Sequence, residues 1–287
     1  MSVDIYERIV ELRRAGRRAA LATIVKRLGS TPRKDHAKML FLDDGSSVGS
    51  VGGGCVEAAV WEAAQTAIAQ GRAQLLKYEL NDDDAENEGL VCGGTVEVFV
   101  EPLLPNPKLI ILGAGHLGRA LSNIVQPLGF EVTVLDDRSS FATPERFPGA
   151  NVVCQPFESG LDHLNVNADT FILIVTRGHR HDQAALEQAI QTTARYVGMV
   201  GSRRKIALLV NNLLGKGHSP ELFRRLYAPI GLDIGSETPE EIAISVAAEL
   251  IALQKGTHKR SAKQEFLLSL VEREKGLKGP SRQHKSE

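Results

Sequence analysis

Residues 109–121 read LIILGAGHLGRAL, and this stretch decides how the rest of the chain is interpreted. Four large apolar residues run directly into the glycine pattern G-x-G-x-x-G, and a helical pattern follows, so the stretch predicts a strand, a tight turn and a helix. In such a turn Gly113 permits the tight bend, Gly115 lets backbone N–H groups approach a pyrophosphate, and Gly118 lets the helix pack closely on the strand. The sequence therefore predicts a dinucleotide-binding type of fold.

A second apolar stretch, residues 130–135, ends in Asp136, Asp137 and Arg138. In this type of fold an acidic residue at that position bonds the ribose 2′-hydroxyl of a nucleotide, which makes Asp136 a candidate ligand. The adjacent Arg138 suits a 2′-phosphate instead. NAD and NADP therefore both remain open as cofactors, and whether this half of the chain binds a nucleotide at all is a separate question.

The composition bounds the class of protein. A chain of 287 residues suggests about two domains, and a formal net charge of −1 argues against nucleic acid as a main partner. No apolar stretch reaches the roughly 18 residues that a bilayer span requires, and residues 1–20 lack the apolar core of a signal peptide. We therefore expect a cytoplasmic protein with no membrane partner. Its three cysteines, an odd number at wide spacing, fit a reducing compartment better than a disulfide framework.

Residues 1–101 predict a small α+β domain. Its expected elements are a helix, a strand, a two-stranded hairpin, a helix and two further strands, at residues 4–14, 19–25, 37–42 with 46–51, 52–69, 73–80 and 95–101. Residues 102–108, PLLPNPK, hold three prolines and indicate a linker. The boundary between two domains is expected there.

Two cysteines of this first domain lie beside runs of glycine. Residues 52–57 read GGGCVE and residues 92–94 read CGG. The dipole of a helix stabilises a thiolate in its first turn, so Cys55 is a candidate reactive thiol, and packing as a small apolar residue is its alternative. Glycines clear space around Cys92 in the same way. Two such pairings in one domain suggest a pocket into which a thiol points.

Two loops combine small residues with cations and suit an anion. Residues 26–33 offer the hydroxyl groups of Ser30 and Thr31 beside Arg33, and an ordinary polar loop is the alternative. Residues 201–205, GSRRK, place Arg203 where a strand ends and a helix starts, and a solvated helix face is the alternative.

Residues 109–256 alternate between strands and helices, which predicts a doubly wound parallel sheet. Residues 176–182, TRGHRHD, follow a fully apolar strand and are expected to face the ligand crevice. Thr238 and Glu241 form a capping box that starts the helix at 242–253. The basic C-terminal extension, residues 257–287, is expected to form a short helix near 266–271 and to be partly disordered.

These motifs together resemble the XdhC/CoxI family of xanthine dehydrogenase accessory proteins. The resemblance covers about residues 8–255 and rests on motifs that occur in the family's order: GSTPR, GGGCVE, CGG, GAGHLG, TRGH, GSRRK, APIGLDIG and TPEEIA, at residues 29–33, 52–57, 92–94, 113–118, 176–179, 201–205, 228–235 and 238–243. Several of these motifs are unusual outside the family.

The resemblance implies an α/β protein in which a small α+β domain precedes a Rossmann-like domain. It implies a chaperone that binds molybdenum cofactor (molybdopterin) and assists its sulfuration and insertion into a molybdenum hydroxylase such as xanthine dehydrogenase, without oxidising substrate itself. It points to Cys92 as the cofactor-binding residue and contact to molybdenum, whereas the motif cysteine at Cys55 is not universal in the family. A homodimer, and a cysteine desulfurase as a further partner, are expected from it.

The chemistry of the residues agrees with this expectation. Molybdenum with dithiolene and sulfido ligands is soft, so a thiolate is a suitable partner, and the basic loops suit the phosphate of a pterin. The candidate cofactor-binding residues are the glycine-flanked cysteines, the basic loops and the Rossmann turn with its acidic partner: Cys92, Cys55, Gly93, Gly94, Gly53, Gly54, Ser30, Thr31, Arg33, Gly113, Gly115, Gly118, Asp136 and Arg203.

The alternative function is an NAD(P)-dependent oxidoreductase that uses the Rossmann domain. Such an enzyme needs an acid or base near the nicotinamide, and His179 with Asp182 are the candidates. Binding of NAD(P)H separates this alternative from the chaperone.

Overall fold

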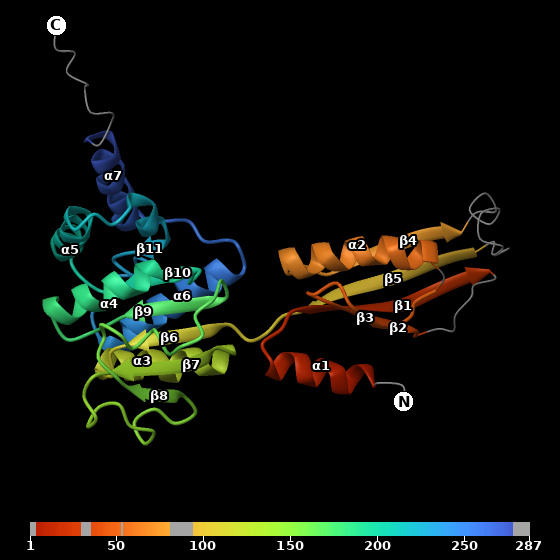
Figure 1. Cartoon of the computed structure of the whole chain (residues 1–287), viewed down its shortest axis with the longest axis horizontal. Coiled ribbons are helices and arrows are strands. Elements are labelled where there is room, and N and C mark those ends of the chain that lie inside the picture. The colour runs from red at the N-terminus through yellow and green to blue at the C-terminus, as the bar shows by residue number, and fades with distance from the viewer. Residues whose placement is uncertain (1–3, 30–35, 53, 81–93, 278–287) are drawn as a thin grey trace, which may run out of the picture. The chain divides into compact units, whose positions relative to one another are not determined.

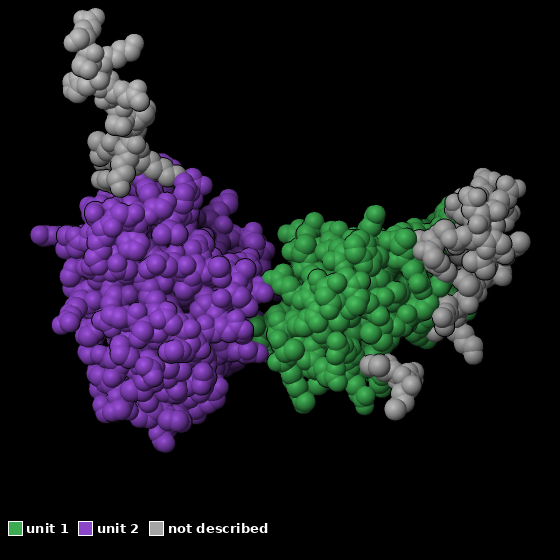
Figure 2. Space-filling model, viewed as in Figure 1, with its two compact units in different colours: residues 1–106 green, residues 107–287 purple. Residues whose placement is uncertain are grey.

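The computed structural model describes residues 4–29, 36–52, 54–80 and 94–277 of the chain. It divides into two compact units, Met1–Asn106 and Pro107–Glu287, which Figure 2 colours separately. Each unit contains its own sheet and its own buried core. No helix in the described part of the chain is long and apolar enough to cross a membrane.

The first unit is built on a five-stranded antiparallel sheet with the strand order β3-β2-β1-β5-β4. Its elements are α1 (Ile5–Arg14), β1 (Ala19–Gly29), β2 (Lys38–Leu42), β3 (Ser47–Gly49), α2 (Gly54–Gln70), β4 (Gln74–Leu80) and β5 (Gly94–Leu103). The predicted strand at residues 19–25 thus continues to Gly29. The reason is backbone pairing, since residues 26–29 take partners on β5 beyond a bulge that follows Ile24.

Alternation along β1 gives this sheet two buried faces. Ala20 and Ala22 pack beneath α2, where Ala64 lets the helix approach the sheet closely. Leu21 points to the other face and packs with Leu12 of α1. The two helices therefore lie on opposite sides of the sheet, as Figure 1 shows.

The second unit is built on a six-stranded parallel sheet with the order β11-β10-β9-β6-β7-β8. Its elements are β6 (Lys108–Leu112), α3 (His116–Val125), η2 (Gln126–Leu128), β7 (Glu131–Asp136), β8 (Asn151–Cys154), β9 (Thr170–Ile174), α4 (His179–Gln191), β10 (Tyr196–Met199), α5 (Arg203–Gly215), η3 (Pro220–Arg225), β11 (Leu226–Tyr227), α6 (Pro239–Gln254) and α7 (Ala262–Leu277). Counted in chain order the strands run 6-5-4-1-2-3, which is the order of a Rossmann fold. The predicted fold class is confirmed.

Helices cover both faces of this parallel sheet, as expected for strands that are apolar along their whole length. Ile110 and Leu112 of β6 face the core that α4, α5 and α7 complete. Leu109 and Ile111 face the core that α3 and α6 complete. The order of strands reverses between β6 and β9, so the carboxyl ends of these two strands flank the crevice in which such folds bind ligands.

Within the C-terminal extension, the described residues 262–277 form one helix, α7. α7 spans 16 residues, and its Leu267 and Val271 are buried in the core of the second unit. Upstream of it, Arg260 Nη1 donates to the carbonyl oxygen of Leu226 at 2.8 Å. The short apolar stretch at 266–271 therefore belongs to a longer helix that is held by tertiary packing, which local polarity does not reveal.

Candidate functional site

The glycine turn lies between β6 and α3, at the point where the strand order reverses. Gly113 has a φ of +124°, and a Cβ there would lie 2.5 Å from the carbonyl oxygen of Val175. A Cβ at Gly118 would overlap the carbonyl oxygen of Gly113. A Cβ at Gly115 would meet nothing within 4 Å. Packing therefore requires glycine at two of the three positions, whereas Gly115 leaves open space before the N-terminus of α3.

Asp136 ends β7 beside this turn and is 1% exposed. Its Oδ2 accepts from the Ala114 N–H at 2.8 Å and from Arg138 Nη2 at 2.9 Å. Its Oδ1 accepts from Arg138 Nε at 2.8 Å and from the Arg138 N–H at 3.1 Å. Burial raises the pKa of Asp136, but the hydrogen bonds from Arg138 and the Ala114 N–H outweigh it, so the pKa lies below its ordinary value. Both carboxylate oxygens thus bond groups of the protein.

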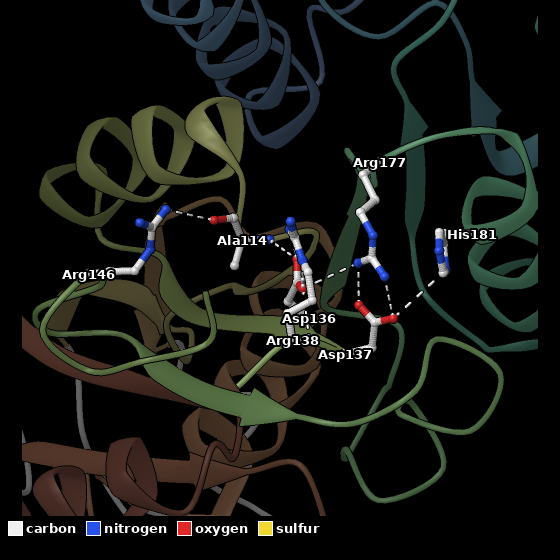
Figure 3. A network of polar contacts seen from close by, with 7 residues as sticks. All are labelled: Ala114, Asp136, Asp137, Arg138, Arg146, Arg177 and His181. Atoms are coloured by element: carbon white, nitrogen blue, oxygen red, sulfur yellow. Dashed lines mark hydrogen bonds and ion pairs between the residues drawn. The ribbon is translucent and has the colours of Figure 1, made fainter. Parts of the chain in front are cut away.

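A second acidic side chain faces an arginine across the crevice. Arg177, which follows β9, donates through Nη2 to Asp137 Oδ2 at 2.8 Å, and its Nη1 bonds Asp137 Oδ1. His181 Nδ1 lies 4.0 Å from the same carboxylate. The hydrogen bond from Arg177 lowers the pKa of Asp137 to about 2. Figure 3 shows that this ion pair joins the end of β7 to the loop after β9.

The side chain of Arg146 completes the polar network in Figure 3. Arg146 Nη2 donates to the carbonyl oxygen of Ala114 at 3.1 Å, so side chains hold both the N–H and the carbonyl group of this turn residue. The guanidinium of Arg138 lies 3.6 Å from the ring centre of Phe141, and that of Arg146 lies 4.8 Å from it. The sequence pattern named Asp136 and Arg138 here, but not Arg146 or Phe141.

The predicted candidates His179 and Asp182 lie in different environments. Asp182 is fully buried, accepts from Thr176 Oγ1 at 2.6 Å and forms an ion pair with Lys205. His179 is exposed at the start of α4. The buried carboxylate of Asp182 thus bonds a half-buried ammonium group and a hydroxyl group, and it links α4 to α5.

Some residues of the basic motif at 201–205 stabilise the fold, and others are exposed. Ser202 caps α5 by accepting from the Lys205 N–H at 3.3 Å, and the side chain of Lys205 neutralises Asp182. Arg203 stays exposed, with its guanidinium 5.7 Å from the ring centre of Phe266. Beside this turn a cavity of about 270 Å³ opens at the carboxyl end of β10 and is lined by the loop at residues 229–236.

The N-terminal candidates fall mostly outside the described residues. Ser30, Thr31, Arg33, Gly53, Cys92 and Gly93 lie outside them, and for Gly54 and Cys55 the structure describes only the backbone at the start of α2. Gly94 begins β5. Among the described residues no group of three or more His, Cys, Asp or Glu side chains is arranged to hold a metal ion.

The described backbone shows where the chain enters or leaves the N-terminal motifs. The register of the sheet pairs Gly29, at the end of β1, with Gly94, at the start of β5. Arg18, just before β1, donates to the carbonyl oxygen of Ile68 at 3.4 Å, so the last turn of α2 lies at the opposite end of β1. The first turn of α2 therefore points towards the end of the sheet that holds Gly29 and Gly94 (Figure 1).

The chain matches two family models and several known proteins. Residues 109–250 match the XdhC Rossmann domain, and residues 12–79 match the XdhC and CoxI family. The uncharacterized protein YqeB of Escherichia coli (strain K12) is 36% identical over 254 residues, which are 88% of this chain and 46% of YqeB. The chain thus spans about half the length of that relative.

Two further relatives match over most of their length. A probable xanthine dehydrogenase subunit of Bacillus subtilis (strain 168) is 27% identical, over 83% of this chain and 93% of the relative. The molybdenum cofactor insertion chaperone PaoD of Escherichia coli (strain K12) is 25% identical, over 85% of this chain and 86% of PaoD. A solved xanthine dehydrogenase structure from Bacillus halodurans has 24% identity and a TM-score of 0.49, over 91% of this chain and 98% of that one.

Proposed function

We propose, from the premise that this chain belongs to the XdhC and CoxI family, that it binds molybdenum cofactor and delivers it to a molybdenum hydroxylase. An accessory role for a molybdenum enzyme follows from the family and its relatives. Cofactor binding, assistance in its sulfuration and insertion are the proposal. The observation that supports it most is that Gly29 and Gly94, which adjoin the GSTPR and CGG segments, are paired at one end of one sheet, towards which the first turn of α2 points.

The donor chemistry of those segments suits the proposed cargo. Cys92 supplies a thiolate, a soft ligand that is suited to molybdenum with dithiolene and sulfido ligands, and Cys55 at the start of α2 is the second candidate. Ser30, Thr31 and Arg33 follow directly on Gly29 and supply hydroxyl and guanidinium donors for the phosphate of the pterin. A carrier must release its cargo, so a few contacts of this kind suffice.

The test is retention of the cofactor by the full-length protein. Purified protein is incubated anaerobically with molybdenum cofactor and desalted, and molybdenum and pterin are then measured per chain. We expect near-stoichiometric retention, and a loss of at least tenfold for Cys92→Ala, since a metal–thiolate contact is removed.

Cys154→Ala is the matched control, because Cys154 is an exposed free thiol on β8 of the other unit. It should retain the cofactor as the unmodified protein does. Equal retention by Cys92→Ala would remove Cys92 from the site, and no retention by any form would reject the carrier function.

The remaining expectations concern partners and place. We propose that the client is a hydroxylase of the xanthine dehydrogenase type, that a cysteine desulfurase acts with the protein on the cofactor, and that the protein works as a homodimer in the cytoplasm. Co-purification with the client and light scattering of the purified chain test these points separately.

The second candidate function is an NAD(P)-dependent oxidoreductase, and the observation that favours it is the strand order of the second unit. Against it, the buried carboxylate of Asp182, the proposed partner of His179, already forms an ion pair with Lys205. Turnover of NADPH or NADH with any carbonyl substrate would favour this candidate over the carrier.

A further inference from the structure

We propose that the β7 edge of the Rossmann crevice is a binding site for a phosphomonoester and does not recognise an unphosphorylated ribose. The site consists of Arg138, Arg146 and Arg177, here called the arginine edge, together with the glycine turn beside it. The ligand class is a phosphorylated nucleotide or pterin whose phosphate monoester is bound by guanidinium groups. The site itself is independent of the proposed carrier function.

The first step is that Asp136 cannot serve as a ribose ligand. It is 1% exposed, and each of its oxygens accepts two hydrogen bonds from the protein. A ribose hydroxyl would have to displace either the Ala114 N–H or the guanidinium of Arg138. Displacing the first would leave a buried N–H group without a partner, and displacing the second would break a charge-assisted bond to a buried carboxylate. Each loss costs more than the new bond to a neutral hydroxyl contributes. Asp136 instead fixes the position of the turn and of Arg138.

The second step is that the groups around this carboxylate are cationic. Arg138 uses Nε and Nη2 for Asp136 and rests one face on Phe141, and its Nη1 has no partner among the described residues. Arg177 is 37% exposed and forms ion pairs with the carboxylates of Asp136 and Asp137. The three guanidinium groups of the arginine edge outnumber the two carboxylates that neutralise them. A dianionic phosphate complements this excess, whereas a neutral diol does not.

The third step is the ion pair between Arg177 and Asp137. Asp137 is 24% exposed, so it can turn to solvent when another anion takes its place on Arg177. Until then it holds Arg177 beside the end of β7 (Figure 3). A bound phosphate would therefore replace Asp137 as the acceptor on Arg177, whose guanidinium is already in position. This limits the entropy cost of ordering the Arg177 side chain.

The glycine turn adds a second anion subsite beside the arginine edge. Gly115 leaves open space at the N-terminus of α3, and the adjacent Ala114 is bonded to Asp136 and Arg146. A ligand with two phosphates on one ribose, such as 2′,5′-ADP, can thus place one phosphate on each subsite. The phosphate monoester can come from a nucleotide or from molybdopterin, and only the pterin source rests on the proposed function.

The test compares 2′,5′-ADP with 5′-AMP by calorimetric titration of the full-length protein at fixed salt. These probes differ by the single 2′-phosphate. We expect 2′,5′-ADP to bind at least tenfold more tightly, because a charge-assisted contact is worth about a factor of ten or more. Affinities equal within twofold, or no binding of 2′,5′-ADP at millimolar concentration, would overturn the proposal.

Two substitutions separate a ligand site from a structural ion pair. Arg177→Gln should weaken 2′,5′-ADP about tenfold and change 5′-AMP less than twofold. Asp137→Asn should strengthen 2′,5′-ADP about threefold, since it removes a competing and repelling carboxylate. If the ion pair merely supported the loop, both substitutions would weaken binding. That common sign would overturn the proposal.

Arg224→Gln is the matched control for the lost charge. Arg224 is an exposed arginine of the same unit that pairs with Glu221, and its substitution should change neither affinity by more than twofold. Release of bound molybdopterin by 2′,5′-ADP identifies the pterin phosphate as the natural occupant, and unchanged retention identifies a nucleotide. If the chain retains no pterin, the carrier function fails while the nucleotide titrations still decide this proposal.

Discussion

The second unit buries two carboxylates that are held in opposite ways. Asp136 lies at the crevice and is bonded by a guanidinium and by backbone N–H groups. Glu249 of α6 is fully buried and bonded by neutral donors, the hydroxyl of Tyr196 and Nε2 of Gln264 at 2.6 Å. His258 Nε2 lies 3.6 Å from the same carboxylate. The first arrangement fixes a binding edge, and the second joins β10, α6 and α7.

The comparison teaches that burial of an acid does not by itself mark a ligand site. Glu249 is less exposed than Asp136, yet its hydrogen-bond partners come from two other elements of the core, β10 and α7. The side chains around Asp136 stay partly exposed and positively charged, with Arg138 28% exposed. The arginine edge differs from the Glu249 cluster because the charged side chains around its buried carboxylate still face solvent.

The largest effect is expected for Glu249→Ala. It leaves the Tyr196 hydroxyl without an acceptor in the core and leaves Gln264 Nε2 with only its 3.3 Å bond to the carbonyl oxygen of Pro229, which should lower the free energy of unfolding by about 3 kcal/mol. Scanning calorimetry of the full chain measures the change. Glu249→Gln keeps an acceptor and should cost about 1 kcal/mol, and equal losses for the two variants would show that the carboxylate is not bonded as described.

A smaller effect is expected for Asp136→Asn, which should lower the free energy of unfolding by about 2 kcal/mol. The amide cannot accept at both positions, so it leaves Arg138 or the Ala114 N–H unsatisfied, but Arg138 can turn partly to solvent. The same calorimetry applies. Because the glycine turn loses a support, binding of 2′,5′-ADP should also weaken, whereas Glu249→Gln should leave it unchanged. A larger loss of stability than Glu249→Ala would reverse the comparison.

The smallest effect is the acid dependence of the Arg177 ion pair. The pKa of Asp137 is lowered to about 2 in the folded chain, against about 4 in the unfolded chain. Its contribution is therefore fully present above about pH 4 and is lost as the pH falls through the folded value. Asp137→Asn should cost less than about 1 kcal/mol at pH 7 and reduce the fall in Tm between pH 5 and pH 2.5. An unchanged fall would mean that the pair contributes nothing.

Much of the fold could be predicted because its signals are local. The apolar run and glycines at residues 109–118 and the capping box at Thr238 act within a few residues, and both appear as expected. The roles of Gly113 and Gly118 also follow from the turn they form.

The rest depended on distant partners. Residues 26–29 became strand because β5 offers pairing, and the two-residue β11 has no periodicity of its own. At the site, Arg177 was in a named motif, but Arg146 reaches Ala114 from 32 residues away and carries no local signal. The position of Asp136 in the sequence also did not indicate that both of its carboxylate oxygens accept hydrogen bonds from the protein.

α7 is part of the packed core of the second unit. The family match ends at residue 250, but Gln264, Leu267 and Val271 complete a polar cluster and an apolar core that begin before it. A fragment cut at the end of the family pattern would expose apolar surface and leave Glu249 with a lost donor. The region that matches the family therefore ends before the packed core of the second unit does. A fragment of this unit made for experiments should include α7.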